Sequence, residues 1–520
     1  MESMHARGYE RRWWTLIVLC LSLLVIALDN TILNVALPTL VGELDASGSD
    51  LQWIVDSYVL VFAGLLLVMG SLGDKFGRKL ALYAGFVIFG LSSLLAAYSG
   101  SSDMLIASRA LMGVGGALIM PATLSILVNV FPREERARAI AIWAATAGVG
   151  VPLGPVAGGW LLDHFWWGSI FLVNIPIIAA AMLAGWWLVP ESRDEHAPAI
   201  DWFGGLLSIA ALATLLYAII EAPNEGWTSP LTLSAFGLAT LLLAAFLAWE
   251  RRIPEPMLKL ELFRDARFSA GAAAISLVFF ALFGSIFILT QYLQFVIGYT
   301  PLEAGLRMLP VAVGIGMGTG LSTRLVPRVG TRVAVALGLT IVSGGLLYAS
   351  MLEVDSGYLT ISSLFLILGF GMGNAMAPAT DAIMSAIPES NAGVGSAVND
   401  TTRQVGGALG VAVLGSITST IYTSEMSAAA TGLPAPQAAA VENSIGGALG
   451  VAGQIGGQAG QALALAADAG FVDAMGVTFQ VAAGVALAGA LVALAFLPSR
   501  QPAEAEAVAV ESSETEAARV

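Results

Sequence analysis

Charged residues are scarce in this sequence. They make up 12% of its 520 residues, whereas hydrophobic residues make up 57%. An average soluble protein has about 25% charged residues. The composition therefore excludes a soluble multi-domain protein with an ordinary polar surface.

Cysteine and histidine are scarcer still. Cys20 is the one cysteine, which excludes a disulfide within the chain. The three histidines, His5, His164 and His196, lack the spacing of metal ligands. We therefore expect no metal site and no cofactor.

Lysine occurs three times, and never in a G-x-x-x-x-G-K-[ST] phosphate-binding loop, which argues against an ATP-driven pump. No Ser/His/Asp or Cys/His set indicates an enzyme. The 23 Lys and Arg residues form no broad basic face, so we expect no nucleic-acid partner. Much of the net charge of −14 comes from loops and from residues 499–520, which we expect to be a disordered acidic cytoplasmic tail.

Long apolar runs make up most of the remaining sequence. A helix that crosses the hydrocarbon of a membrane needs about 20 mostly apolar residues. The first run continues to Leu40 without a cleavage-site pattern, so we interpret it as an uncleaved span. Fourteen runs reach the required length and predict an all-α polytopic membrane protein that is embedded in a lipid bilayer: residues 13–41, 51–72, 80–99, 104–130, 137–162, 169–189, 202–221, 231–249, 268–297, 304–326, 332–352, 358–386, 394–422 and 472–497.

The placement of Lys and Arg supports this number of spans. Cytoplasmic connections carry most of these residues in membrane proteins. With the N-terminus inside, the connections expected outside contain no Lys or Arg, and only Arg109 and Arg307 lie toward the outer side, within helices. Both termini are then cytoplasmic. Because 20 of the 23 basic residues are Arg, we expect a bacterial protein of the inner (cytoplasmic) membrane.

The connections divide the chain into two bundles. We expect a six-helix bundle in 1–190, two additional spans with linkers in 191–265, and a second six-helix bundle in 266–498. The segment 424–470 is rich in Ala, Gly and Gln, and we interpret it as a long outside loop that can include a small helical hairpin. GSLGDKFGRKL and GLSTRLVPRVGTR place glycine and arginine at similar offsets in the two bundles, and internal repeats are typical of secondary transporters.

Asp29 is an acid deep in the first span, about 24 Å along the helix from Trp13. A charge there is costly, so it should face a water-filled cavity or be neutralised. Burial favours the neutral acid, which can take up and release a proton or hold a cationic substrate. A structural hydrogen bond between helices is the alternative. Arg109 in the fourth span is a cation that needs a partner, and Asp29 lies at comparable depth; a relay and a static pair are both open.

GSLGDKFGRKLAL joins the second and third spans on the inner side, and it contains Gly70, Asp74, Gly77 and Arg78. Two bundles that rock against each other need charged contacts that break and reform, so we interpret this segment as a gating loop. An ordinary positive-inside loop is the alternative.

The fifth span contains GVGVPLGPVAGGWL. Small residues allow close approach of helices, and proline bends a helix. The functional interpretation is a bend that seals one bundle against leak, and simple packing is the alternative. The motif residues are Gly150, Gly154, Pro155, Gly158 and Gly159.

Acids also occur in the second half of the chain. Asp381 lies toward the inner end of the twelfth span, and Asp400 lies in the first turns of the thirteenth. Either is a candidate for coupling, although Asp400 can also pair with Arg403 at i,i+3. Asp56 lies near the outer end of the second span, and we interpret it as an acid at the membrane–water interface.

These motifs together resemble the major facilitator superfamily and, within it, the 14-helix drug:proton antiporter family. LDNTILNVALP, GSLGDKFGRK, LIASRALMGVGGA and GVGVPLGPVAGG match its motifs, with Met112 in place of a usual glutamine and Ala141 at the first glycine position of the fifth-helix motif. The resemblance implies alternating access, with export driven by inward proton flow. It also implies that Asp29 binds the proton, Arg109 assists, and Asp74 and Arg78 gate.

Three functions stay open from the sequence. The first is an exporter of small lipophilic or cationic drugs or antibiotics by proton antiport, working as a monomer. The second is a transporter of the same fold for a narrower metabolite class, such as an amino acid or a siderophore. The third is a membrane enzyme or receptor without transport.

Overall fold

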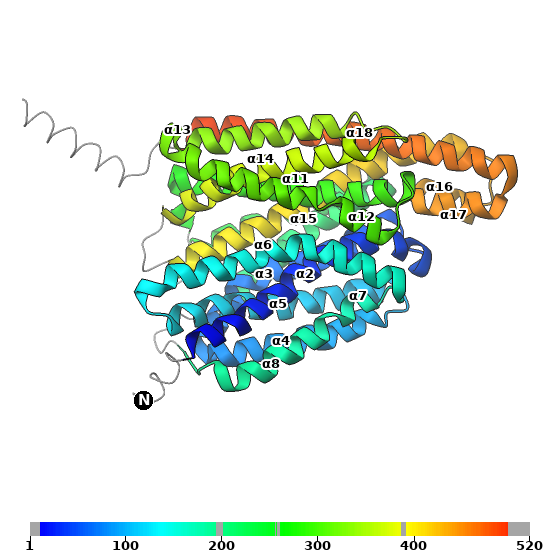
Figure 1. Cartoon of the computed structure of the whole chain (residues 1–520). Helices are drawn as coiled ribbons and strands as arrows, with labels where there is room; N and C mark the ends of the chain where they lie inside the picture. The colour runs from blue at the N-terminus through cyan, green and yellow to red at the C-terminus, as the bar shows by residue number, and fades with distance from the viewer. Residues whose placement is uncertain (1–10, 194–200, 255, 257–259, 386–391, 498–520) are drawn as a thin grey trace, which may run out of the picture.

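The computed structural model describes residues 11–193, 201–254, 256, 260–385 and 392–497. Long α-helices account for most of them, and the part described contains no β-strand. The helices run side by side along one direction (Figure 1). Their bounds are α2 Arg12–Leu44, α3 Gly48–Phe76, α4 Arg78–Ala97, α5 Ser102–Val130, α6 Arg133–His164, α7 Ser169–Leu172, α8 Asn174–Leu188, α9 Trp202–Glu225, α10 Pro230–Glu250, α11 Ala266–Gln291, α12 Pro301–Arg307, α13 Pro310–Ala349, α14 Tyr358–Ser385, α15 Ala392–Ala430, α16 Ala435–Asn443, α17 Ile445–Ile455 and α18 Gly457–Phe496, with short helical turns at Leu260–Arg264 and Tyr292–Val296.

The two ends of the molecule differ in charge. The turns that carry Arg78, Arg251 and Arg332 lie at one end, together with the start of α2; we call it the basic end (left in Figure 1). The helices α16 and α17 project from the opposite end, which we call the hairpin end (right in Figure 1). Helices α2 to α8 form the first bundle, and α11 to α15 with α18 form the second.

Twelve helices of the described chain are long and apolar enough to cross a membrane. One of the twelve, Pro301–Ala349, makes two passes: glycines at 314 and at 345 both pack against residues 366–370 of α14, so the halves of α13 run antiparallel. The 32-residue helix α6 is about 48 Å long and packs along α2. The structure confirms the predicted all-α polytopic membrane fold, with twelve candidate spans in the described chain against the fourteen runs predicted.

The reversal in α13 occurs at Gly330, whose φ is +83°. Gly77, between α3 and α4, also has a positive φ of +126°. Residues with a side chain rarely adopt this conformation, so both tight turns at the basic end depend on glycine. The weak repeat noted in the sequence thus corresponds to the same kind of turn in each bundle.

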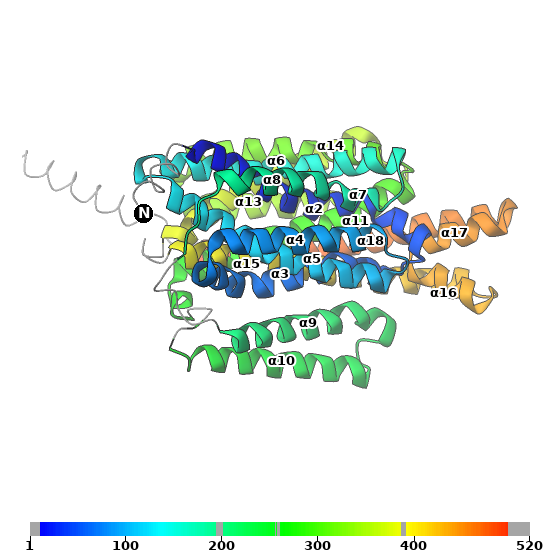
Figure 2. The ribbon, with the colours of Figure 1, turned by 90° about the horizontal axis from the view of Figure 1, so that it is seen from below.

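The helices α9 and α10 lie to one side of the bundles (Figure 2). A Cβ on Gly64 of α3 would overlap Ile209 of α9, so these helices are in close contact. On its other side α9 contacts the second bundle, where Ser416 Oγ donates to the Ile219 carbonyl at 2.8 Å. The extra pair therefore touches both bundles through α9, and α10 packs against α9.

The segment 424–470 is almost wholly helical, and α16 and α17 correspond to the small helical hairpin that this outside segment was expected to be able to include. α15 continues to Ala430, α18 begins at Gly457, and α16 and α17 lie between them. The Ser444 hydroxyl accepts a hydrogen bond from the Gly447 amide and caps α17. Alanine favours helix strongly, and capped ends stabilise even short helices, so the abundant Ala outweighs the Gly and Gln that suggested a loop.

The predicted acidic tail, 499–520, lies outside the described residues. The division into 1–190, 191–265 and 266–498 stays a prediction in its boundaries.

Candidate functional site

Asp29 of α2 and Arg109 of α5 form an ion pair inside the first bundle. Asp29 is fully buried and Arg109 is 1% exposed. Charges taken out of water are tolerated only where partners compensate them. Each of these residues therefore neutralises the other within the apolar bundle. Of the two expectations for Asp29, neutralisation applies here rather than contact with a water-filled cavity.

Asn174 is a second partner of Asp29. Its Nδ2 donates to Asp29 Oδ1 at 3.2 Å and to Ser93 Oγ at 3.2 Å, and all three side chains are buried. Asn174 begins α8 and extends the network to Ser93 of α4, and the carboxyl group of Asp29 connects α2, α5 and α8. A change in its charge would be felt by all three.

Arg109 is held by α3 as well. Its Nε donates to the Ile54 carbonyl at 3.2 Å, and its guanidinium lies 4.4 Å from the centre of the Tyr58 ring. A cation over an aromatic face is stabilised by the ring quadrupole. Arg109 Nη1 also lies 3.8 Å from Met112 Sδ, so Asp29 is the one anionic group among these four contacts of the arginine.

Asp29 points away from the second bundle. Thr31 and Asn34 lie two and five residues after Asp29. At about 100° per residue, this places them about 140–200° around α2 from Asp29, on the opposite face of the helix. Both of these polar side chains line a cavity shared with residues of the second bundle. The acid and the bundle interface are therefore on different sides of one helix.

Three glycines of the fifth-span motif face α2. Gly150, Gly154 and Gly158 recur at every fourth position, and a Cβ on Gly154 would overlap Thr31. A Cβ on Gly158 would lie 2.7 Å from Ile32 Cγ1. Small residues at this spacing let the two helices pack backbone to backbone. This face of α6 packs within the first bundle.

The adjacent face of α6 meets the second bundle. A Cβ on Gly159 would overlap the backbone of Leu302, and a Cβ on Gly305 would overlap the Pro155 carbonyl. We call these four residues the seam. Since α6 belongs to the first bundle and α12 to the second, the motif serves both packing within a bundle and contact between bundles.

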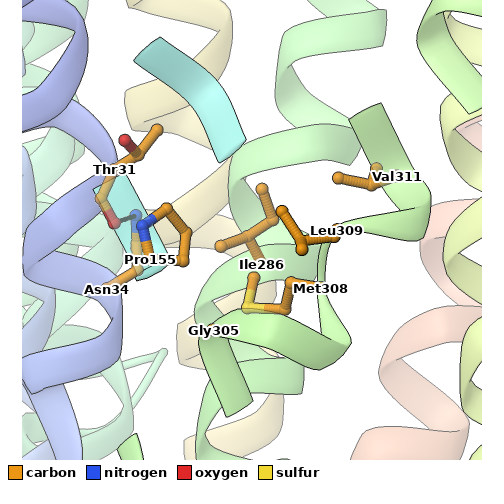
Figure 3. Close-up of a pocket in the computed structure, with 8 residues that line it drawn as sticks. All are labelled: Thr31, Asn34, Pro155, Ile286, Gly305, Met308, Leu309 and Val311. Carbon is orange, nitrogen blue, oxygen red and sulfur yellow. Dashed lines mark hydrogen bonds between the residues drawn. The ribbon is translucent and has the colours of Figure 1, made fainter. Parts of the chain in front are cut away.

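A small cavity lies beside the seam (Figure 3). Its volume is about 20 Å³, enough for about one water molecule. A drug-sized molecule does not fit, so the bundles are closed on each other at this level. On the hairpin side of the cavity, Gln294 Nε2 donates to the Val35 carbonyl at 2.8 Å, which is another contact between the bundles. The lining residues are Thr31, Asn34, Pro155, Ile286, Gly305, Met308, Leu309 and Val311.

The predicted gating loop forms the turn between α3 and α4. Arg78 Nε and Asp74 Oδ1 are 2.7 Å apart in a half-exposed ion pair, and the Arg78 amide donates to the Ser192 carbonyl at 2.9 Å. Gly77 makes the turn, and Gly70 packs against α5 one helix turn before Asp74. Asp74 lies about 24 Å along α3 from Tyr58, so the loop does not touch the Asp29–Arg109 pair.

The two predicted acids of the second bundle differ in environment. Asp400 is 9% exposed, and its Oδ1 lies 3.9 Å from Arg403 Nη1. Arg403 also donates from Nη2 to Thr380 Oγ1 at 3.3 Å, which links α15 to α14. Asp381 is exposed. The observed hydrogen-bond partners of Asp29 are Arg109 and Asn174, and neither Asp381 nor Asp400 is among them.

Sequence reasoning missed Asn174, Ser93 and Tyr58 as parts of this site. An asparagine within an apolar span was a usable signal for the first, because a buried amide requires hydrogen-bond partners. Nothing in the sequence distinguished Ser93 from other hydroxyl residues of the spans. Among the residues that the structure describes, no group of three or more His, Cys, Asp and Glu side chains could hold a metal ion.

Comparison with known proteins gives relatives along almost the whole chain. The multidrug efflux pump LfrA of Mycolicibacterium smegmatis is 37% identical over 487 residues, which are 94% of this chain and 96% of LfrA. The tetracenomycin C resistance and export protein of Streptomyces glaucescens is 34% identical, over 95% of this chain and 93% of that protein. The methyl viologen resistance protein SmvA of Salmonella typhimurium is 35% identical, over 92% of this chain and 96% of SmvA.

Solved structures give the same fold. A bacterial homolog of the human lysosomal transporter Spinster, in an inward-facing and unoccupied conformation, superposes with a TM-score of 0.66 at 20% identity. The match covers 94% of this chain and 98% of that one. The family model of the Major Facilitator Superfamily matches residues 19–411. This chain is a multi-pass membrane protein that belongs to the Major Facilitator Superfamily.

Proposed function

We propose that this protein is a proton-coupled antiporter that exports small lipophilic or cationic molecules, including drugs or antibiotics, by alternating access. Three relatives aligned over more than nine-tenths of this chain are named for multidrug efflux, antibiotic export or resistance to a cationic compound. The observation that carries the coupling is the buried Asp29–Arg109 pair, since it places a titratable carboxyl group inside a helix bundle beside its counter-charge.

Protonation of Asp29 would remove the charge that Arg109 requires. The guanidinium would then be a buried cation with the Ile54 carbonyl, Met112 Sδ and the Tyr58 ring as its remaining contacts in the described chain, an arrangement without a counter-charge that costs several kcal/mol. Movement of α5 or α3 toward a wetter position relieves that cost. Proton binding and helix movement are thereby linked, because a ligand shifts a conformational equilibrium only by its different affinity for the two states.

The seam is the part that would open and close. It is closed at Gly159 and Gly305, and the cavity beside it is too small for a drug-sized molecule. Rocking of the two bundles would separate α6 from α12 and expose Thr31 and Asn34 to the space between the bundles. Those two polar side chains among apolar neighbours suit an amphipathic substrate of modest polarity.

We place the basic end in the cytoplasm of a bacterial cell, with both termini there, because Lys and Arg concentrate in cytoplasmic connections. The hairpin end then faces outward, and closure of the seam corresponds to closure toward the outside. A single chain contains both bundles, so a monomer suffices for transport.

The test is efflux of ethidium, a fluorescent lipophilic cation, from cells of an efflux-deficient bacterial host. Wild type should extrude ethidium in a manner abolished by a protonophore, and Asp29→Asn at equal expression should lose extrusion. Asp103→Asn, an exposed acid at the start of α5, is the matched control and should behave as wild type. Full extrusion by Asp29→Asn would refute the coupling role. If the wild type exported no member of a panel of drugs but transported a single metabolite, the result would favour a transporter for a narrower metabolite class.

A further inference from the structure

Asp56 of α3 is a second fully buried acid, and its carboxyl group is unlike that of Asp29. Neither Oδ1 nor Oδ2 of Asp56 has a hydrogen-bond partner among the described residues. Asp29, by comparison, has Arg109 and Asn174. An ionised carboxylate without any partner is far more costly in an apolar interior than the neutral acid. The surroundings of Asp56 therefore fit a protonated carboxyl group.

The position of Asp56 on α3 follows from its neighbours on the same face. Gln52, Asp56, Val59 and Ala63 recur at steps of four, three and four residues, which form one stripe of a helix. Gln52 Oε1 accepts a hydrogen bond from Ser416 Oγ of α15 at 3.3 Å. Val59 and Ala63 line a small cavity together with residues of α9 and α15. Asp56 lies between these contacts and is thus on the face of α3 that meets the second bundle.

Other charged groups on the elements around α3 lie elsewhere. The Asp29–Arg109 pair, from α2 and α5, is on the opposite face, where Arg109 binds the Ile54 carbonyl. From α9, Glu221 Oε1 accepts from Trp53 Nε1 at 3.1 Å, nearer the hairpin end. From α4, Arg78 and Lys79 lie at the basic end.

On α15, Glu425 lies toward the hairpin end, and Asp400 and Arg403 lie about two to three helix turns closer to the basic end than the level of Asp56. The small cavity lies between them and Asp56. It measures about 10 Å³, at the lower limit for one water molecule, and Gln404 is among its lining residues. Gln404 Oε1 is buried and has no partner in the described part of the chain.

Gln404 lies one helix turn from Asp400 on the same face of α15. Asp56, Gln404 and Asp400 are thus successive polar groups along the interface of the two bundles toward the basic end, and the cavity between Asp56 and Gln404 has an apolar surface. Water would reach Asp56 along this interface only when the bundles separate. An apolar helix interface has no packing reason to hold such a series.

We propose that Asp56 is a second proton-binding carboxyl group of this transporter, protonated in the state described here and connected to the basic end along the interface of α3 and α15. Opening of that interface lets the Asp56 O–H bond break, with the proton passing to water and the carboxylate left behind. The carboxylate takes up a proton again when it is next exposed from the hairpin end. This inference rests on the proposed antiport function and adds a second proton to its cycle.

Infrared spectroscopy of the purified full chain tests the protonation directly. A protonated carboxylic acid has a C=O stretch distinct from that of a carboxylate. The wild type at neutral pH should show this band, and Asp56→Asn should lose part of it. Asparagine resembles the neutral acid in shape and charge, so the variant should fold. The matched control is Asp50→Asn on the same helix, because Asp50 Oδ2 accepts from the Ser47 amide at 2.8 Å as an ionised cap. Equal spectra for Asp56→Asn and Asp50→Asn would overturn the proposal.

Proton counting in proteoliposomes tests the coupling. With ethidium as the transported probe and a pH indicator outside, Asp56→Asn should move one proton fewer per ethidium than wild type and Asp50→Asn. An unchanged ratio would overturn the role of Asp56 in coupling. If the wild type moved no protons with ethidium, the proposed antiport would fail, and the infrared band would still decide whether Asp56 carries a proton.

Discussion

Gly305 of α12 lies directly against the Pro155 carbonyl of α6, with no space for a Cβ between them. The two residues belong to different bundles, so this backbone contact fixes how closely the bundles approach in the hairpin-end half. Gly159 and Leu302 make a second contact of this kind. Alternating access requires the seam to open and close. The seam can close because these two glycines have no side chain between the backbones of α6 and α12.

Substitution of Gly159 should weaken closure of the seam. An added methyl group overlaps the Leu302 backbone, and overpacking of this kind costs about 1–3 kcal/mol. We expect Gly159→Ala to raise the maleimide reactivity of an Asn34→Cys reporter, in a Cys20→Ser background, by roughly tenfold or more, since 1.4 kcal/mol is tenfold. Gly42→Ala is the control, because a Cβ there meets nothing within 4 Å. Equal maleimide reactivity in the Gly159→Ala and Gly42→Ala variants would contradict the role of the seam in closure.

The Asp29–Arg109 pair should contribute to stability as a unit. Asp29→Asn and Arg109→Gln each leave a buried charge without its partner, which costs on the order of 3–5 kcal/mol. The double variant should lose less than the sum of the two, as measured by thermal unfolding in detergent. The half-exposed pair of Asp74 and Arg78 is the control, where Arg78→Gln should cost about 0–1 kcal/mol. Additive losses at Asp29 and Arg109 would argue against a direct pair.

The gating loop should control the rate of transport rather than binding. Asp74 pairs with Arg78 at the end of α3, about 24 Å from Tyr58, so its loss leaves the contacts of Arg109 intact. We expect Asp74→Asn to slow ethidium turnover severalfold at nearly unchanged ethidium affinity. Transport assays in proteoliposomes and fluorescence titration of the purified protein measure the two quantities. Unchanged turnover would show that the ion pair has no role in the cycle.

The two acids of the second bundle should differ in importance. Asp400 is buried at the α15 interface near Arg403, whereas Asp381 is exposed. Perturbed, buried carboxyl groups are the better candidates for coupling. We expect Asp400→Asn to lower proton-driven ethidium export severalfold and Asp381→Asn to change it less than about twofold, in vesicles with an imposed pH gradient. The reverse order would assign the coupling role to Asp381.

Much of the fold was predictable because hydropathy is a local property. About 20 successive apolar residues predict a span whatever surrounds them, so the spans and the basic loops between them could be read directly. The segment 424–470 was harder, since its Ala-rich composition suits both a loop between spans and helices, and the Ser444 cap stabilises one of its helices, α17. The depth of Asp29 and Arg109 was also local information, because a helix rises a fixed distance per residue.

The amino-acid order by itself determined which segments enter the membrane, at which depth each polar residue lies, and where glycine permits close helices. Only the tertiary structure decided which way each polar side chain faces. Helix rotation turns each successive residue by about 100°, so a small change in packing moves a side chain from one neighbour to another. Asp29 meets Asn174, 145 residues away, inside one bundle, while Asp56 meets no hydrogen-bond partner from the described residues at the contact between the two bundles, and no local pattern distinguishes these outcomes.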